Sequence, residues 1–373
     1  MKKIYLDYNA STPIAPDVSR AMQPYLAEHY GNPSSSHWAG APAKAAVEKA
    51  RSQLAGLLGC KFSEVVFTSG GTESNNYAIK GTFFALQDKG SHIITSQIEH
   101  PAVIQPCKFL EKLGAQITYL PVDARGLVDP DDIKKAIKAE TILVSIMHAN
   151  NETGSIQPIS EISKITRERG VWLHSDAAQS VGKIACDVLE LGVDLLSVAG
   201  HKVYAPKGVG AIFIRQGIEL VSFMHGAGHE SGRRAGTENV LLNVGLGAAA
   251  ELAEQLREKS ASCELRDLFF DDLQGHFGDR VVLNGHPTKR LPNTLYVSFV
   301  GKNGSQILQQ LEGVAASTGA ACHADSVELS AVLEAMQIDK QVGMGAIRFS
   351  LGRATTRTDI KAVVEMLKNV VSG

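Results

Sequence analysis

The sequence has no marked excess of charge of one sign and no long apolar run. Its 37 basic and 39 acidic residues give a formal net charge of −2 and a pI near 6.6. This balance provides no electrostatic basis for binding nucleic acid or an anionic membrane surface. No apolar stretch approaches the length that crosses a bilayer. We therefore expect a small-molecule substrate, with neither a nucleic-acid partner nor a membrane.

Cysteine is scarce, and no two cysteines have the short spacing of a disulfide framework or a zinc site. The five are Cys60, Cys107, Cys186, Cys263 and Cys322. The first residues also lack the apolar region of a signal peptide, because Asp7 interrupts them early. The histidines have no paired ligand spacing, so we expect no metal. These features together predict free thiols and a cytoplasmic location.

The sequence does contain short apolar runs that alternate with helical patterns. Strands are expected near residues 64–68, 91–95, 116–120, 141–146, 171–174 and 194–196, with helices such as 73–86, 102–113 and 130–139 between them. This alternation predicts a mostly parallel sheet with helices on both faces. A chain of 373 residues exceeds the usual size of one core, so we expect two lobes. One long helical segment, residues 240–270, is expected to bridge them and to precede a smaller α/β lobe.

Two polar side chains that follow apolar runs indicate a chemistry. Lys202 follows the run that begins at Asp194, and Asp176 ends the run that begins at Val171. Pyridoxal phosphate needs a lysine for its Schiff base and a carboxylate for its pyridinium nitrogen. Partial burial beside a sheet would lower the lysine pKa and help the attachment. The alternatives are a solvated loop lysine and, for Asp176, a helix N-cap.

Other candidates lie in turns near expected strand ends. The Gly-Gly turn 68–72 opens a helix and suits a phosphate, although such turns are common. His100 could stack on a cofactor ring, but a lone histidine is more often a surface residue. Asn151 follows a strand where ligands bind such folds, and an Asx turn is the alternative. Gln179 could contact a ring oxygen of the cofactor.

Cys322 and Arg348 are the candidates in the C-terminal part. Cys322 lies among small residues, where a nucleophilic thiol would be accessible. Arg348 lies in a strand-like run, where a bidentate clamp on a substrate carboxylate would explain it. The alternative for Arg348 is a structural ion pair, and Arg353 competes for the role of clamp.

Eight short strings occur in one order along almost the whole chain. They are Tyr5-Leu-Asp-Tyr-Asn-Ala10, Tyr30-Gly-Asn-Pro-Ser-Ser35, Thr68-Ser-Gly-Gly-Thr-Glu-Ser-Asn75, Ala149-Asn-Asn-Glu-Thr-Gly154, His174-Ser-Asp-Ala-Ala-Gln179, Gly200-His-Lys202, Arg234-Ala-Gly-Thr-Glu238 and Ile347-Arg-Phe-Ser-Leu-Gly-Arg353. In this order they resemble the cysteine desulfurases and the related selenocysteine lyases, within the class V aminotransferase group of pyridoxal phosphate enzymes.

The resemblance implies fold type I, with a large domain built on a mostly parallel seven-stranded sheet and a smaller C-terminal α/β domain. We expect residues 1–15 to pack on the small domain, residues 16–250 to form the large cofactor domain, and residues 251–373 to carry the catalytic cysteine.

The resemblance also implies a role for each site residue. Pyridoxal 5′-phosphate would be held by Lys202, with Asp176 and Gln179 at its ring and His100 stacked on it. Its phosphate would meet Gly71, Thr72 and His201, together with Thr237 from the other subunit of a homodimer. Asn151 and Arg348 would hold the substrate carboxylate, and Cys322 would take the sulfur for a sulfur-acceptor protein.

The sequence departs from the family pattern at several places, one of which is Pro101 after His100, where animal selenocysteine lyases have an acidic residue. Ala199 stands where the family often has a phosphate-binding serine. The segment Gly319-Ala-Ala-Cys-His323 is closer to animal selenocysteine lyases than to many bacterial desulfurases. L-cysteine and L-selenocysteine therefore both remain candidate substrates. Two further hypotheses are an aminotransferase, which would need no thiol, and a catalytically quiet sulfur-relay or scaffold subunit.

Overall fold

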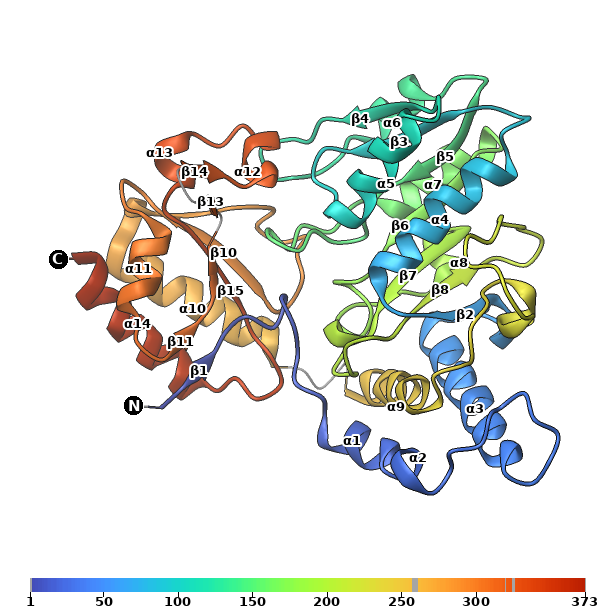
Figure 1. The fold of residues 1–373 in the computed structure, drawn as a ribbon. Helices are drawn as coiled ribbons and strands as arrows, with labels where there is room; N and C mark the ends of the chain where they lie inside the picture. The colour runs from blue at the N-terminus through green and yellow to red at the C-terminus, as the bar shows by residue number, and fades with distance from the viewer. Residues whose placement is uncertain (1, 257–260, 319, 324–325, 373) are drawn as a thin grey trace.

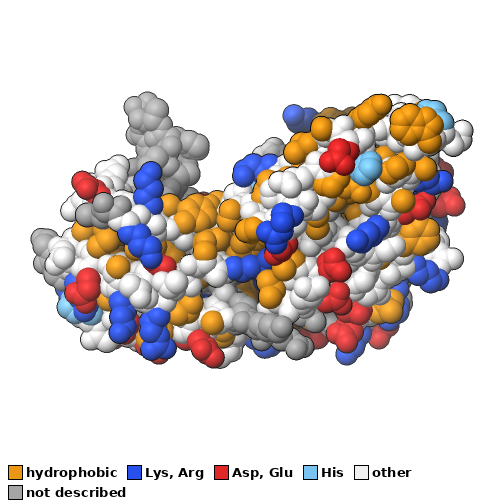
Figure 2. All heavy atoms as spheres, turned by 90° about the horizontal axis from the view of Figure 1, so that it is seen from below, with side chains coloured by type: hydrophobic (Ala, Val, Ile, Leu, Met, Phe, Trp, Pro, Cys, Tyr) orange, Lys and Arg blue, Asp and Glu red, His pale blue; other side chains and the backbone are white. Residues whose placement is uncertain are grey.

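The structure is a computed structural model that describes residues 2–256, 261–318, 320–323 and 326–372. It has two lobes, each with its own hydrophobic core (Figure 1). Within the described residues, no helix is both long and apolar enough to cross a membrane. On the face in Figure 2, basic and acidic side chains are interspersed with apolar ones.

The larger lobe is built on a seven-stranded sheet. In spatial order the strands are β2 (Val65–Thr68), β8 (Gly210–Ile214), β7 (Leu195–Ala199), β6 (Trp172–Asp176), β5 (Thr141–Ser145), β3 (His92–Ser96) and β4 (Gln116–Leu120). Neighbours from β7 to β4 are parallel, and only β8 runs antiparallel to both of its neighbours. The predicted mostly parallel seven-stranded sheet is thus confirmed, although β8 was not predicted from the sequence.

Helices cover both faces of this sheet, because its strands are buried and alternate residues point to opposite sides. On one face lie α3 (Gly40–Leu58), α7 (Ile159–Glu168), α8 (Val188–Leu191) and α9 (Val240–Leu256). On the other lie α4 (Gly71–Ala85) and α5 (Pro101–Glu111). The remaining helical elements of this lobe are α1 (Pro16–Met22), α2 (Pro24–Ala27), η1 (Phe62–Glu64), α6 (Pro130–Ala136), η2 (Gly200–Lys202) and η3 (His229–Gly232).

Local signals explain several helix ends. Asp129 caps α6, because its side chain accepts a hydrogen bond from the Asp131 amide at 2.9 Å. Helix α3 ends at Gly59, whose φ of 65° is left-handed. The predicted single helix over residues 240–270 is wrong, because α9 ends at Leu256 and α10 begins at Ser262.

The smaller lobe contains an antiparallel sheet and three packed helices. Its strands, in spatial order, are β12 (Ser317–Thr318), β15 (Ala346–Ser350), β10 (Thr294–Phe299) and β9 (Val281–Leu283). The packed helices are α10 (Ser262–Phe277), α11 (Gly304–Gln310) and α14 (Arg357–Ser372). A hairpin and short helices complete it: η5 (Gly278–Arg280), β13 (Ala320–His323), β14 (Ser326–Leu329), α12 (Ala331–Ala335) and α13 (Lys340–Gly343).

The N-terminal segment contacts both lobes. Its strand β1 (Ile4–Tyr5) pairs in parallel with β11 (Val314–Ala315), and Asp7 forms a bridge with Ser350. The Thr12 amide then donates to the carbonyl of His201 at 2.9 Å. This path places residues 7–10 between the ends of the two sheets (Figure 1).

Candidate active site

A cavity of roughly 510 Å³ lies where the large sheet, the small lobe and the N-terminal segment meet. Strands β6 and β7 end at this cavity, which is where ligands bind in parallel sheets. Nine residues predicted from the sequence line it: Gly71, Thr72, His100, Asn151, Asp176, Gln179, His201, Lys202 and Arg348. Side chains distant in the sequence thus converge on one site.

Lys202 stands directly after β7, on the single turn η2. Its Nζ donates to the carbonyl oxygens of Asn9 and Ala10, the latter at 2.9 Å. Burial, together with the nearby Arg348 cation, lowers the pKa of Lys202 to about 8, although Asp176 and Asp7 oppose that shift. A larger fraction of the amine is therefore neutral near neutral pH than for an ordinary lysine, which favours attack on an aldehyde.

Asp176 is the last residue of β6 and is buried. Its Oδ1 accepts the Ala178 amide at 2.9 Å, and its Oδ2 accepts Asn75 Nδ2 at 2.7 Å. The Ala178 contact is an Asx-type turn. It resembles the contact that a helix N-cap makes, which was the alternative prediction for Asp176. Asn75 also lines the cavity, and no role for it was predicted from the sequence. Only its position one helical turn after Thr72 could have indicated it.

His100 is the N-cap of α5, and its Nδ1 accepts the Ala102 amide at 3.1 Å. Burial lowers the pKa of His100; Lys202 adds to that shift, and Asp176 opposes it. The neutral ring is therefore favoured. Because Nδ1 accepts, the proton of this neutral ring resides on Nε2.

The start of α4 offers a place for an anion beside His201. Among the described residues, the backbone amides of Gly71 and Thr72 have no hydrogen-bond acceptor. A Cβ on Gly71 would lie 3.1 Å from the Cβ of Ala199, so glycine keeps helix and strand close together. Burial, with nearby Lys202, lowers the pKa of His201 to about 4, so the anion would meet a neutral N–H donor. Two free amides at a helix start suit a phosphate group.

Gln179 is held by two groups for which the sequence predicted no role. Its Nε2 donates to the Asn9 carbonyl at 2.9 Å, and its Oε1 accepts Lys183 Nζ at 2.7 Å. Asn9 is 1% exposed, and its Nδ2 donates to Thr294 Oγ1 at 2.8 Å. Asn9 therefore connects the cofactor side of the cavity with the small lobe.

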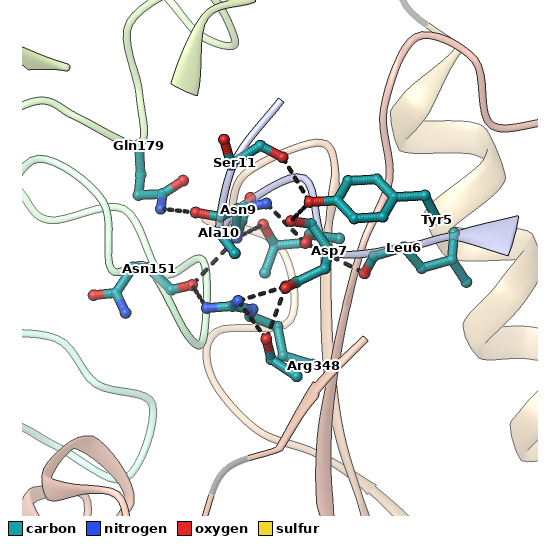
Figure 3. Close-up of polar contacts among 12 residues, drawn as sticks. Tyr5, Leu6, Asp7, Asn9, Ala10, Ser11, Asn151, Gln179 and Arg348 are labelled. Atoms are coloured by element: carbon teal, nitrogen blue, oxygen red, sulfur yellow. Dashed lines mark hydrogen bonds and ion pairs between the residues drawn. The ribbon is translucent and has the colours of Figure 1, made fainter. Parts of the chain in front are cut away.

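Arg348 projects from β15 toward Asp7 and Asn151 (Figure 3). Its Nη2 donates to Asp7 Oδ1 at 2.8 Å and to Ser317 Oγ at 3.0 Å, and its Nη1 donates to the Asn151 carbonyl at 2.9 Å. The ion-pair alternative is therefore realised, with Asp7 as the acid. Figure 3 also shows that the Asn151 side-chain amide points away from the guanidinium.

Two predicted residues lie elsewhere, and the side chain of a third is not described. Arg353 is exposed, lies outside this cavity and stacks over Tyr204 at 4.2 Å from the ring centroid. Thr237 is exposed and does not line the cavity of its own chain. Cys322 belongs to β13, but the position of its thiol lies outside what the structure describes.

The lining residues fit pyridoxal phosphate. The site combines a lysine of lowered pKa, a buried carboxylate and free amides at a helix start. Two buried polar atoms that line it, Asn75 Oδ1 and Arg348 Nε, have no hydrogen-bond partner among the described residues. Buried polar atoms are usually paired, so these orphan atoms suggest that a polar ligand belongs here.

The family model for class-V aminotransferases matches residues 4–363 of this chain. The cysteine desulfurase IscS of Dictyoglomus turgidum is 51% identical, over 99% of this chain and 95% of that protein. A cysteine desulfurase of Nostoc sp. is 46% identical, over 100% of this chain and 93% of that protein.

Solved structures are similar as well. A NifS-like protein has a TM-score of 0.93 and 36% identity, and the match covers 99% of both chains. The protein SspA, in complex with cysteine, has a TM-score of 0.83 and 37% identity, over 93% of this chain and 98% of that one.

Proposed function

Because the chain belongs to the cysteine desulfurases, within the class-V aminotransferase family, we propose that it moves the sulfur of L-cysteine onto Cys322 and releases L-alanine. It is a pyridoxal 5′-phosphate enzyme. The observation that carries the assignment of the site is that Lys202 and Asp176, 26 positions apart, line one cavity.

When bound, the cofactor supplies an aldehyde for covalent attachment and a ring that accepts the electron pair left on the substrate Cα. Lys202 would be the attachment point, and its amine would become free when the substrate amine takes its place. The carbonyls of Asn9 and Ala10 then hold the released amine beside the site. With a pKa near 8, this amine can accept the Cα proton.

Asp176 would pair with the ring nitrogen and keep it protonated, and Asn75 holds this carboxylate in place with a hydrogen bond of 2.7 Å. His100 would stack on the ring and could donate from Nε2, because its Nδ1 accepts the Ala102 amide. Thr72 and His201, at the start of α4 and beside it, would hold the phosphate of the cofactor. The side chains of Asp176 and His100 are each oriented by a contact within the protein, so these two need little reorganisation when the ligand binds.

The substrate carboxylate binds Arg348 and the Asn151 amide. Asp7, Ser317 and the Asn151 carbonyl already take three of the five guanidinium N–H groups. The carboxylate therefore uses the two remaining N–H groups, one on Nη1 and the one on Nε, or replaces Ser317 or Asp7 on Nη2. Either contact fixes the amino acid with its Cα toward Lys202.

Sulfur transfer balances without an added oxidant or reductant. The C–S bond of L-cysteine breaks, a new S–S bond forms on Cys322, and the products are L-alanine and a Cys322 persulfide. A sulfur-acceptor protein in the cytoplasm then takes the outer sulfur. A homodimer would let Thr237, which is exposed and away from its own cavity, reach the phosphate of the partner's cofactor.

Two measurements test this proposal. Borohydride reduction of the loaded enzyme, followed by peptide mass mapping, should place the pyridoxyl group on Lys202. Replacing Cys322 by alanine should abolish alanine formation from L-cysteine and leave the absorbance of the bound cofactor unchanged. Full L-cysteine turnover by the Cys322→Ala enzyme, or an adduct on another lysine, would refute the assignment. L-selenocysteine is the comparison substrate, because selenol ionises more readily and depends less on the thiol.

A further inference from the structure

Lys183 is a partly buried lysine beside the cavity, and the proposed reaction does not use it. It follows β6 by seven residues, and its Nζ donates to Gln179 Oε1 at 2.7 Å and to Asn9 Oδ1 at 3.1 Å. Both acceptors are neutral amide oxygens. Among the described residues Lys183 has no carboxylate within ion-pair distance.

An ammonium group without an anionic partner is unfavourable in the protein interior. Burial, with Lys202 and then Arg348 as nearby cations, lowers the pKa of Lys183 well below its usual value. The neutral amine is therefore favoured more than in an exposed lysine, and it keeps two N–H donors for its two contacts. A methionine would fill similar space at this position without an unfavourable charge. What lysine provides and methionine does not is the pair of hydrogen bonds to Gln179 and Asn9.

The contact to Gln179 decides which way its amide faces. Lys183 Nζ donates to Gln179 Oε1 at 2.7 Å, so the oxygen of the Gln179 amide points toward the amine. The amide nitrogen then points toward the Asn9 carbonyl and has one N–H left for the cavity that Gln179 lines. The same Asn9 carbonyl accepts the amine of Lys202. Lys183 is thus connected through Gln179 and the Asn9 carbonyl, by three hydrogen bonds, to the lysine that would hold the cofactor.

We propose that Lys183 is a positioning residue, which orients the Gln179 amide so that its free N–H faces the ring oxygen of the cofactor. This inference rests on the proposed roles of Gln179 and Lys202. An N–H aimed at that oxygen stabilises its anionic form. Lys183 would therefore lower the pH at which the lysine-linked cofactor loses its proton.

The charged and titratable groups around Lys202, where the cofactor would be attached, come from several elements. Arg348 of β15, Asp176 of β6 and Asp7 of the N-terminal segment act on Lys202, and the two histidines His100 and His201 are close enough to feel its charge. None of them contacts Lys183 through a hydrogen bond. Substitution at Lys183 therefore leaves their direct contacts in place.

The test is a pH titration of the absorbance of the loaded enzyme without substrate. Lys183→Met should raise the titration midpoint by about half a unit or more, while Lys183→Arg, which keeps the donors, should lie closer to the wild type. Gln179→Leu should raise the midpoint as well. The double variant K183M/Q179L should match Q179L alone, because Lys183 acts through Gln179. Lys164→Met, an exposed lysine on α7, is the matched control and should not shift the midpoint.

Each other outcome overturns a specific claim. An unchanged midpoint in K183M with a shifted one in Q179L refutes the inference and leaves the proposed function intact. Additive shifts in the double variant also refute it, since Lys183 would then act by another route. An unchanged midpoint in Q179L refutes the role of Gln179 itself. Melting temperature and the dissociation constant of the cofactor are measured alongside, and K183Q carries the same prediction if K183M does not fold.

Discussion

The cofactor end and the carboxylate end of the cavity are built differently. At the cofactor end, Lys202 and Asp176 are placed by neighbouring parallel strands, β7 and β6, which are paired residue by residue. At the carboxylate end, Arg348 is held by Asp7, 341 positions away, and by Asn151, 197 positions away. The first end depends on one sheet. The second depends on how the small lobe, the N-terminal segment and the large lobe meet.

This difference predicts how the two ends respond to change. Strand ends of one sheet are fixed by the main-chain ladder, so a side-chain substitution there removes chemistry and leaves the geometry intact. Contacts between segments depend on a few side chains, so a substitution there alters both position and charge. We therefore expect the cofactor end to lose activity with little structural effect and the carboxylate end to change substrate affinity and local pKa values.

The largest effect is expected for Lys202→Ala. The variant loses both the attachment point and the base, so turnover should fall by at least about 1,000-fold. The fold should remain, because Lys202 only closes a short turn and its partners are two carbonyls at the surface of the cavity. Alanine formation and the melting temperature together check this. A variant that melts far below the wild type would contradict the view that this end is fixed by the sheet.

The cofactor end was also the easier one to predict from sequence. Lys202 and Asp176 each follow an apolar run, and the alternation of strands and helices indicated that such runs end at one edge. Strand β8 was missed because Pro206-Lys-Gly-Val-Gly210 has the composition of a turn and hides the short buried run that follows. The break between α9 and α10 was missed because no glycine or proline lies between Leu256 and Ser262.

The carboxylate end could not be predicted in the same way, because it depends on contacts between residues far apart in the sequence, which no local sequence pattern indicates. The sequence placed Arg348 in a strand and left open whether it was a clamp or part of an ion pair. Asp7 lies in one of the motifs, but nothing in its surroundings points to a partner near the C-terminus. Lys183 and Gln179 are four residues apart in turns, not in a helix, so helical spacing could not have paired them. These contacts follow from the tertiary fold alone.

A second prediction compares the two arginines that competed for the role of clamp. Arg348→Ala should raise KM for L-cysteine by roughly 100-fold, because loss of a charge-assisted contact costs about 2–3 kcal/mol. Arg353→Ala should change KM by less than about twofold, since that side chain is exposed and outside the cavity. Steady-state kinetics of both variants, with melting curves, check the pair. Similar KM values for the two variants would exclude Arg348 as the clamp.

The smallest expected effect separates charge from geometry at Asp7. Asp7→Asn keeps the shape and an oxygen for Arg348, but removes a negative charge that raises the pKa of Lys202. The Lys202 pKa should therefore fall below about 8, by about half a unit. Only the neutral amine attacks the cofactor aldehyde, so uptake of pyridoxal phosphate by the cofactor-free enzyme rises as the pH passes upward through this pKa. At pH 7 the variant should take up the cofactor roughly two to three times faster.

Stopped-flow absorbance over a range of pH measures this rate, and the exposed Asp88→Asn is the matched control. Because the aldehyde is the same in all three proteins, the difference between their profiles reports the enzyme amine alone. A midpoint that moves to higher pH in Asp7→Asn would mean that the substitution displaces Arg348 and moves its positive charge away from Lys202. The position of Arg348 would then affect the Lys202 pKa more than the charge of Asp7 does. We expect the opposite, because Asp7, Ser317 and Arg348 are joined to one another by hydrogen bonds and asparagine has the same shape as aspartate.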